Sequence, residues 1–360
     1  MLVLTKPIDI SLPYPFEEKY PLDQILFFDI ETTGFAAEVT SLYLIGCIYY
    51  QNNQWQLTQW FADDYHSEVT ILHSFFQLLS NYQYLIHYNG NGFDLPYLMK
   101  KCEQHKLTYN FSDIHSVDLY KKITPYKKIF RLENYKLKTI EQFLDIARDD
   151  TYSGGELIHV YGDFLKAKIK GDSIQDDYLH LLLLHNEDDL KGLLQLTKIF
   201  SYTDFLELES PLDHYDLQPD KLVLTLNLSS PLAKRLTFGN EDIRITAYQD
   251  QATIQIPIYR DELKFFYQNY KDYYYLPKED MAIHKSVAFY VDKDYRTKAK
   301  AATCYSRKTG RFVPQLCDLL TPFFRKEYHD SISYVELTDE LLEDSQVLTR
   351  YANHLIRSAY

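Results

Sequence analysis

Carboxylate side chains follow the first strongly apolar segment of the chain. Residues 24–29 (QILFFD) predict a buried strand, and Glu31 comes two positions after Asp29. Residues i and i+2 of a strand point to the same face, so these two carboxylates would project side by side. Adjacent carboxylates repel unless a cation neutralises them, and hard oxygen ligands suit Mg²⁺ or Mn²⁺. The pair therefore indicates a divalent-metal site, the alternative being a solvated strand end.

A second acid, Asp94, follows the strand predicted over residues 84–87. Gly90 and Gly92 lie between that strand and Asp94, and they allow a close backbone approach or a positive φ. Asp94 stands directly before a helix predicted over residues 95–105, where its carboxylate could cap the helix N-terminus. The same position is compatible with a metal ligand.

A third polar group lies inside the long helix predicted over residues 176–200. His185 and Asp189 are four positions apart and share one helical face, while neighbouring leucines form the apolar face. The helix would thus present an imidazole and a carboxylate together. The alternative is that His185 caps or packs and that the acidic run 187–189 is solvated.

The segments between these motifs predict a mixed sheet with helices around it. Two strands follow the first in an antiparallel meander, and strands and helices alternate afterwards. The predicted strands span residues 24–29, 39–50, 54–61 and 84–87, and the predicted helices span residues 68–79, 95–105, 137–146 and 176–200. We expect an α/β domain over residues 21–202, preceded by an N-terminal extension over residues 1–20.

Beyond residue 202 the apolar pattern changes to period two. Three strands are predicted over residues 221–228, 242–248 and 252–259, the last two separated by the polar break Gln249-Asp250. A strand at 286–291 and a C-terminal helix, which Thr338 would cap and which would end at Arg357, complete the pattern. We expect an α+β domain over residues 203–360 that covers or extends a substrate groove.

The blocks FDIETTG, NGNGFD and HNEDD, in this order, resemble the three exonuclease motifs of the DEDD superfamily on the ribonuclease-H fold. The stretch LKTIEQFLDIARDDTYSGGELIHVYGDF, followed by HNEDDLKGLLQL, is similar to the YprB-like ribonuclease-H-like proteins of bacteria in particular. The resemblance covers about residues 20–200. It implies a hydrolase with a ribonuclease-H-like mixed sheet flanked by helices, namely a metal-dependent 3′-to-5′ exonuclease.

The resemblance also implies roles for the acids. Asp29, Glu31, Asp94 and Asp189 would be the catalytic and metal-binding quartet, with two Mg²⁺ or Mn²⁺ ions as cofactors. In that scheme Asp29 bridges both ions, Glu31 and Asp189 hold the ion that activates water, and Asp94 acts mostly through water. Two such ions clamp the attacking and leaving oxygens of an in-line phosphoryl displacement.

His185 would orient or deprotonate the attacking water, because an unperturbed imidazole accepts a proton near neutral pH. The chain departs here from the family pattern. In the histidine branch the base precedes the last Asp by five positions, and in the tyrosine branch a Tyr precedes it by four. His185 precedes Asp189 by four. The alternative is that His185 packs or caps and that the metal alone activates the water.

Basic residues concentrate in two stretches of a chain whose net charge is -13. Residues 120–138 contain seven basic residues and one acid. Residues 296–311 contain six basic residues and no acid, and both stretches contain Tyr. Such stretches favour a channel for single-stranded DNA or RNA over a merely solvated loop. By resemblance, Thr32 and Thr33 would touch the terminal nucleotide. The candidate substrate-binding residues are Thr32, Thr33, Asn89, Lys121, Lys122, Lys127, Lys128, Arg131 and Arg307.

The composition is that of an ordinary globular chain. With 360 residues, 46% of them hydrophobic and 25% charged, it can bury a large core in two domains. No apolar run reaches the roughly 18 residues of a membrane span, and the N-terminus lacks the apolar centre of a signal peptide. We expect a cytoplasmic protein without a membrane partner. The four cysteines include no C-x-x-C pair, which argues against a zinc knuckle or a disulfide framework.

Two other functions fit the same residues. One is a catalytically weak nucleic-acid-binding module that uses the acids only for metal-assisted docking, although retention of all four acids argues against it. The other is a nuclease that acts on small nucleotides or on structured junctions with the same ions. The sequence does not separate DNA from RNA, because that depends on contacts to the 2′-OH and on groove shape.

Overall fold

The computed structural model describes residues 1–147, 152 and 154–359. The chain divides into two units, which are Met1–Thr203 (unit 1) and Asp204–Tyr360 (unit 2). Among the described residues, no helix combines the length and the apolar character that crossing a membrane requires.

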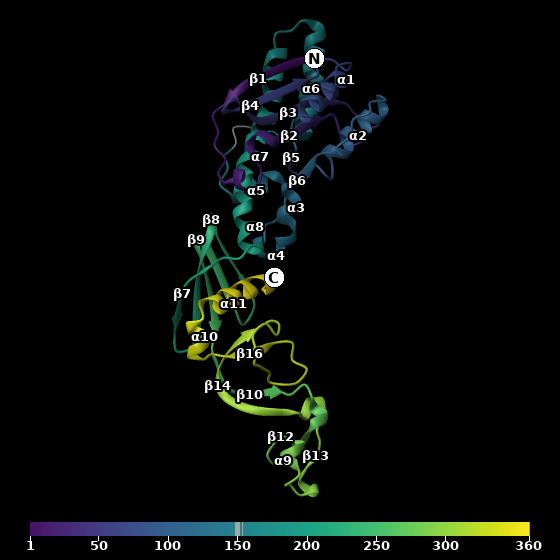
Figure 1. Cartoon of the computed structure of the whole chain (residues 1–360). Helices are drawn as coiled ribbons and strands as arrows, with labels where there is room; N and C mark the ends of the chain where they lie inside the picture. The colour runs from purple at the N-terminus through teal and green to yellow at the C-terminus, as the bar shows by residue number, and fades with distance from the viewer. Residues whose placement is uncertain (148–151, 153, 360) are drawn as a thin grey trace. The chain divides into compact units, whose positions relative to one another are not determined.

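Unit 1 is built on a six-stranded mixed sheet with the strand order β1-β4-β3-β2-β5-β6 (Figure 1). The strands from β1 to β2 in this order pair antiparallel, whereas β2, β5 and β6 pair parallel. The strands are β1 (Leu2–Ile8), β2 (Ile25–Thr32), β3 (Leu42–Gln51), β4 (Gln54–Phe61), β5 (Tyr84–His87) and β6 (His115–Asp118). The mixed sheet agrees with the expected α/β class.

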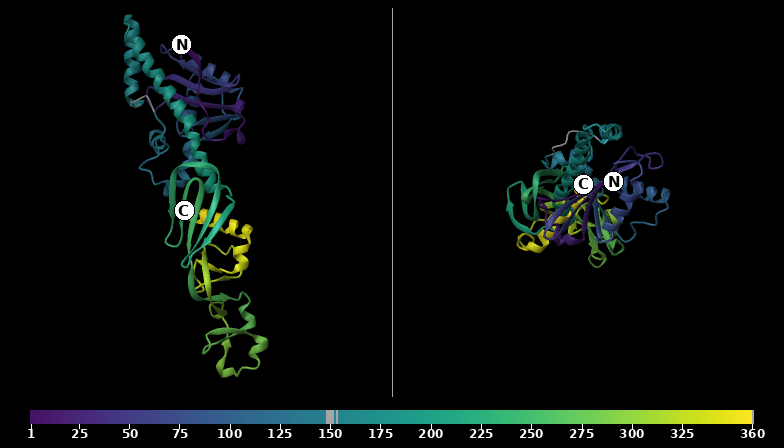
Figure 2. Two further views of the ribbon diagram at one scale, coloured as in Figure 1. Left: turned by 90° about the vertical axis from the view of Figure 1, so that its left-hand side faces the viewer. Right: turned by 90° about the horizontal axis from the view of Figure 1, so that it is seen from above.

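Helices cover both faces of this sheet. Phe28 of β2 stacks on Phe75 of α1 at 5.5 Å between ring centroids, whereas the next residue, Asp29, accepts a hydrogen bond from Asn186 of α7. Because successive strand residues point to opposite faces, α1 and α7 lie on opposite sides of the sheet. Helix α6 packs beside α7 (both teal in Figure 2). The helices are α1 (Glu68–Leu79), α2 (Asp94–Gln104), α3 (Leu119–Ile123), α4 (Lys127–Phe130), α5 (Leu137–Phe143), α6 (Gly154–Lys170), α7 (Gln175–Gln195) and α8 (Ile199–Glu207).

The N-terminal residues contribute to the sheet of unit 1. The sequence sets residues 1–20 apart as an extension, but their first part forms the edge strand β1, paired with β4 along its whole length. Pro7 lies within β1, and an edge strand tolerates its missing N–H group. The segment 120–138, expected as a basic loop, consists largely of short helical turns, including α3 and α4.

Unit 2 contains three antiparallel sheets and a few helices, as expected of an α+β domain. The strand orders are β7-β8-β9, β10-β14-β16-β15 and β12-β11-β13. The strands are β7 (Leu212–Leu217), β8 (Lys221–Gly239), β9 (Arg244–Pro257), β10 (Tyr259–Phe266), β11 (Tyr273–Leu276), β12 (Met281–His284), β13 (Thr297–Lys298), β14 (Tyr305–Gln315), β15 (Phe323–Phe324) and β16 (Ser333–Glu336). The helices are α9 (Lys285–Ala288), α10 (Asp339–Glu343) and α11 (Ser345–Ser358).

Local hydrogen bonds explain where the elements of unit 2 match or depart from the sequence pattern. Thr338 caps α10 by accepting from the N–H of Leu341, as predicted. The strand predicted over residues 286–291 is wrong: α9 begins there, because the His284 imidazole accepts from the Ser286 N–H and caps a helix. The break at Gln249 does not separate two strands. Gln249 adopts a φ of 52° inside the continuous strand β9.

Candidate active site

The carboxyl end of β2 presents Asp29 and Glu31 toward α7. Glu31 Oε1 lies 3.6 Å from Nε2 of His185, and Asp29 Oδ2 accepts a hydrogen bond of 3.0 Å from Asn186. Glu31 is buried, and its Oε2 also accepts from the hydroxyl of Tyr43 at 3.4 Å. The pairing of β2 with β3 shifts register directly after Glu31, so the regular strand ends at the acidic pair.

Helix α7 supplies His185 and Asp189 to the same site. Nε2 of His185 lies 3.5 Å from Oδ2 of Asp189, one helical turn further along α7. One ligand atom each from Glu31, His185 and Asp189 lie within 4.8 Å of one another. His185 is buried, so its imidazole is fixed between the two carboxylates rather than solvated.

The acidic run of α7 is divided between two roles. Glu187 pairs with Lys6 of β1 and with Lys191, each at 2.7 Å. Burial alone would raise the pKa of Glu187, but the hydrogen bonds from Lys191 and Lys6 outweigh it and bring that pKa below its ordinary value. Glu187 therefore anchors α7 to the sheet edge, while Asp189 faces the acids of β2.

Asp94 approaches the site from a third element. It is the first residue of α2 and not its N-cap, which is Phe93. Burial raises the pKa of Asp94 to about 7, and the charge of Asp118 contributes in the same direction. Hydrogen bonds from its own N–H and from the N–H of Ile30 oppose this rise. Ile30 lies between Asp29 and Glu31 on β2, so its hydrogen bond joins the start of α2 to β2 at the acidic pair.

The four acids form one electrostatic cluster. Burial raises the pKa of Asp29 well above its usual value, and the charges of Asp189, Glu31 and Asp94 raise it further. The hydrogen bond from Asn186 acts in the opposite direction. A cluster of carboxylates whose mutual repulsion raises a pKa binds a proton or a cation to relieve it. Hard oxygen ligands are those that Mg²⁺ and Mn²⁺ take, so the donor set fits such ions.

Asn186 is a site residue that the sequence motifs did not reveal. It is fully buried, its Nδ2 donates to Asp29, and its Oδ1 accepts from Nε2 of Gln59 at 2.9 Å. Asp29, Gly46 and Gln59 are directly opposite one another across β2, β3 and β4. Asn186 lies over Gly46, where an added Cβ would stand 2.0 Å from its Oδ1. A side chain at position 46 would therefore expel the amide that holds Asp29.

Comparison with protein-family models gives the same architecture. Residues 26–201 match the model of the RNase_H_2 family in the RNase H superfamily. This range begins in β2 and includes all four acids and His185. With the mixed sheet and flanking helices, the described residues of this range have a ribonuclease-H-like fold, and this part of unit 1 is called the ribonuclease-H-like domain. The α/β class expected from the sequence, with a mixed sheet flanked by helices, is thus confirmed.

The chain is similar to the family B DNA polymerase from the hyperthermophilic archaeon Pyrobaculum calidifontis, with a TM-score of 0.39 and 12% sequence identity. The similarity covers 69% of this chain and 35% of the polymerase chain, about a third of its length. No curated protein matches the sequence.

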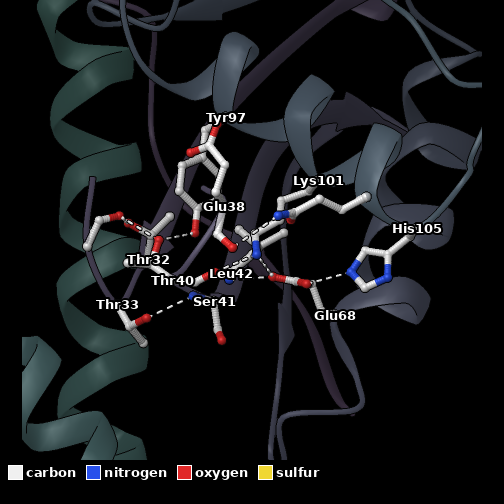
Figure 3. A network of polar contacts seen from close by, with 12 residues as sticks. Thr32, Thr33, Glu38, Thr40, Ser41, Leu42, Glu68, Tyr97, Lys101 and His105 are labelled. Atoms are coloured by element: carbon white, nitrogen blue, oxygen red, sulfur yellow. Dashed lines mark hydrogen bonds and ion pairs between the residues drawn. The ribbon is translucent and has the colours of Figure 1, made fainter. Parts of the chain in front are cut away.

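The loop that follows β2 in the ribonuclease-H-like domain is held by a buried polar network (Figure 3). Lys101 of α2 donates to the carbonyl oxygen of Thr40 and pairs with Glu68 of α1 at 3.0 Å. Glu68 also accepts from the N–H of Leu42 at 2.7 Å and contacts His105 at 2.6 Å. Because Lys101 and Glu68 are both buried, this network fixes the loop against two helices.

Thr32 and Thr33 take part in the structure of that loop. The hydroxyl of Thr32 donates to the carbonyl oxygen of Gly34 at 2.9 Å, and the hydroxyl of Thr33 accepts from the N–H of Ser41 at 2.8 Å. Both hydroxyls thus shape the chain beside the acids. Their contact with a nucleotide stays a prediction.

The turn before α2 differs in detail from the expectation. Gly90 and Gly92 do not adopt positive φ; Asn89 does, at 59°. Gly90 is needed for a close approach instead, since a Cβ there would lie 2.6 Å from Nδ1 of His87. The N–H of Asn89 donates to Asp118 at 2.9 Å. Asp118, at the end of β6, was not singled out in the sequence, and it organises this turn.

The predicted basic residues fall into two groups. In unit 1 the exposed side chains lie on or directly after α3 and α4, and they are Lys121, Lys122, Lys127, Lys128 and Arg131. Arg307 lies on β14 of unit 2, where its guanidinium is 3.1 Å from Glu262 and 3.9 Å from Asp280. Two acids thus balance its charge, which does not favour the predicted contact of Arg307 with a phosphate.

Proposed function

We propose that the ribonuclease-H-like domain is a metal-dependent nuclease that trims single-stranded nucleic acid as a 3′-to-5′ exonuclease. The observation that carries this proposal is the convergence of four carboxylates from β2, α2 and α7 into one cluster with a raised Asp29 pKa. Four buried or half-buried acids destabilise one another unless cations join them. The order of the three motifs, which resembles that of DEDD exonucleases, supports the polarity.

The acids would hold two divalent ions, Mg²⁺ or Mn²⁺. When bound, such ions neutralise charge on the scissile phosphodiester and polarise it for in-line attack by water. Asp29, oriented by Asn186, and Glu31, oriented by Tyr43, are fixed before any ion arrives. This preorganisation lowers the cost of assembling the site.

His185 has a defined place in this scheme. Its Nε2 faces Oε1 of Glu31 and Oδ2 of Asp189, at 3.6 and 3.5 Å. We assign His185 to hold or move the proton of the attacking water at Nε2, within reach of both carboxylates. Its pairing with Asp189 one turn away shows how a spacing of four positions brings the imidazole to the acids.

The loop after β2 offers a surface for the substrate. Phe35 is 90% exposed, and its ring lies 5.8 Å from that of Phe93, the residue before Asp94. An exposed aromatic ring beside a cluster of acids suits stacking on an unpaired base. The network around Lys101 holds this loop in place, so the ring is presented on a fixed backbone.

Unit 2 is proposed to bind the same nucleic acid as the ribonuclease-H-like domain. Phe289 and Tyr290 are 77% and 86% exposed, and the stretch 296–311, which begins six residues after Tyr290, has six basic residues and no acid. Removal of residues 204–360 is then expected to weaken affinity while leaving some metal-dependent activity on short substrates. Unchanged affinity in that truncated protein would contradict this role.

The proposed polarity and substrate are tested together with end-labelled oligonucleotides. Purified protein is incubated with 3′-labelled and 5′-labelled single-stranded DNA and RNA, in Mn²⁺, Mg²⁺ or EDTA. Release of labelled mononucleotide from the 3′ end, with the 5′ label shortened stepwise, is the expected result. Binding without cleavage under every metal would instead support a nucleic-acid-binding module.

A further inference from the structure

We infer that a cavity beside the β5–α2 turn, lined by Tyr88, Tyr120 and Tyr135, binds an unpaired nucleobase of the substrate strand. This inference rests on the proposed nuclease function, because the base that it places in the cavity belongs to the nuclease's substrate strand. The cavity has a volume of about 770 Å³ and lies wholly within unit 1.

The three tyrosine rings are held by hydrogen bonds and ring contacts. The hydroxyl of Tyr88 donates to the carbonyl oxygen of Tyr135 at 2.6 Å, and the hydroxyl of Tyr135 donates to the carbonyl oxygen of Lys127 at 3.2 Å. The rings of Tyr88 and Tyr120 meet edge to face at 5.8 Å. All three are only half-buried. Fixed, partly exposed rings stack on a base with little loss of conformational entropy.

Two lysines lie beside these rings. Nζ of Lys127 lies 5.8 Å from the centroid of the Tyr120 ring and 5.2 Å from that of Tyr135. Lys136 also lines the cavity, and Glu133 is the acid among the lining residues. Exposed lysines next to aromatic rings are the arrangement that binds single-stranded nucleic acid, because the rings take the bases and the cations take the phosphates.

Asp118 connects the cavity to the acidic cluster. Its Oδ1 accepts from the N–H of Asn89, which lines the cavity, at 2.9 Å and from the N–H of Tyr120 at 3.1 Å. The N–H of Asn91, in the same turn, donates to Oδ2 of Asp118 at 3.3 Å, and this turn leads directly into α2, which begins with Asp94. A base stacked on Tyr120 is thus held at a fixed position relative to Asp94.

This geometry selects the class of substrate. Stacking on tyrosine tolerates every base, because each base has a π-face. A paired base within a duplex is already stacked on both faces, so the cavity favours single strands over duplexes. The cavity therefore adds affinity and position to the strand without reading its sequence.

The test uses the full chain and a set of single-stranded oligonucleotides that carry 2-aminopurine at successive positions from the 3′ end, in EDTA to prevent cleavage. In the wild type, one or two positions should lose fluorescence on binding because the base stacks. Tyr120→Ala should restore that fluorescence and weaken affinity by about 5- to 150-fold, whereas Tyr120→Phe keeps both within about twofold. Tyr65→Ala is the matched control, since Tyr65 is 64% exposed in the same unit but outside the cavity.

Two further variants keep the test decisive. Tyr120→Leu preserves apolar volume if Tyr120→Ala fails to fold, and it should also lose the fluorescence change. Lys127→Ala should reduce the slope of log affinity against log salt concentration by about one, because one fewer counterion is released on binding. The tyrosine variants should leave this slope unchanged.

The outcomes separate this inference from the proposed function. If the wild type releases mononucleotides with Mn²⁺ while Tyr120→Ala binds and quenches like the wild type, the cavity assignment is overturned and the nuclease stands. If Tyr120→Ala loses binding but the wild type never cleaves, the cavity assignment stands and the nuclease does not. A wild type that binds none of the oligonucleotides overturns the cavity assignment.

Discussion

A single methyl group at position 46, on the strand next to β2, is expected to disable the site. In Gly46→Ala the new Cβ would lie 2.0 Å from Oδ1 of Asn186 and 2.6 Å from Cδ1 of Leu190. Asn186 is fully buried and bonded to Asp29 and Gln59, so it cannot move aside without breaking those bonds. Overpacking costs about 1–3 kcal/mol, and loss of a hydrogen bond to a charged group costs about 1.5–3 kcal/mol.

We therefore expect Gly46→Ala to lose roughly 3 kcal/mol of unfolding free energy, which for a domain of this size lowers Tm by about 6–12 °C. Because α7 carries His185 and Asp189, a shift of this helix by about 1 Å should also reduce nuclease activity about 100-fold. Urea denaturation and nucleotide release measure the two effects on the same preparation.

Gly162→Ala is the matched control. A Cβ at Gly162 on α6 meets nothing within 4 Å, so this change should be neutral or stabilising by about 1 kcal/mol or less. In the double variant Gly46→Ala, Asn186→Ala the clash with the amide is gone. Its loss of unfolding free energy should therefore be smaller than the sum of the losses in the two single variants. Wild-type stability and activity in Gly46→Ala would refute the packing described between α7 and β3.

Three further predictions follow from the charges of unit 1 and unit 2. The pKa of Asp94 is raised from 3.8 to about 7, so the stability of its neutral form is fully present below about pH 4 and is lost as the pH rises through 7. In EDTA, the Tm measured by differential scanning fluorimetry should thus fall between about pH 4 and pH 7, and the Tm of Asp94→Asn should fall less; an equal fall contradicts the assignment. Lys101→Met should cost about 3 kcal/mol in urea denaturation because it leaves Glu68 buried without that cation, and a loss below about 1 kcal/mol would show the loop network to be dispensable. Arg307→Ala should change oligonucleotide affinity less than about twofold, since acids already hold its guanidinium; a tenfold loss would restore the contact predicted from the sequence.

The sequence predicted the local part of the candidate site. Asp29 and Glu31 share a strand face, and His185 and Asp189 share a helix face, because both relations depend only on the geometry of one element. The helix over residues 68–79 was likewise predicted to the residue. Such features follow from periodicity within a short segment.

The support of the site depends on contacts between distant segments. Asn186 binds Asp29 because Gly46 and Gln59 are opposite Asp29 in neighbouring strands, and strand register is not encoded in any one of the segments. Asp118, at the end of β6, shapes the turn that follows the neighbouring strand β5, although the two strands are far apart in the sequence. The available signal for the contact of Asn186 with Asp29 was Gly46, a glycine in the middle of β3 where a side chain would normally pack.

Other departures have the same origin. The edge strand β1 exists because β4 provides its partner, and pairing with so distant a segment gave no local signal within residues 1–20, which were therefore expected to be an extension. The basic segment after β6 forms helical turns because Asp118 caps α3 and Arg131 ends α4 with a φ of 50°. These turns bring Tyr120 and Tyr135 to one cavity, which an extended basic loop would not do.

The most direct test of the central claim compares two neighbours on α7. Asp189→Asn removes a carboxylate that faces Glu31 and His185, whereas Glu187→Gln removes one that faces Lys6. With Mn²⁺ and a 3′-labelled single strand, the rate of nucleotide release should fall about 1,000-fold or more in Asp189→Asn, since a proposed metal ligand is lost, and stay within about threefold of wild type in Glu187→Gln. Equal rates in the two variants, or release that persists in EDTA, would contradict a metal-dependent site built from these acids.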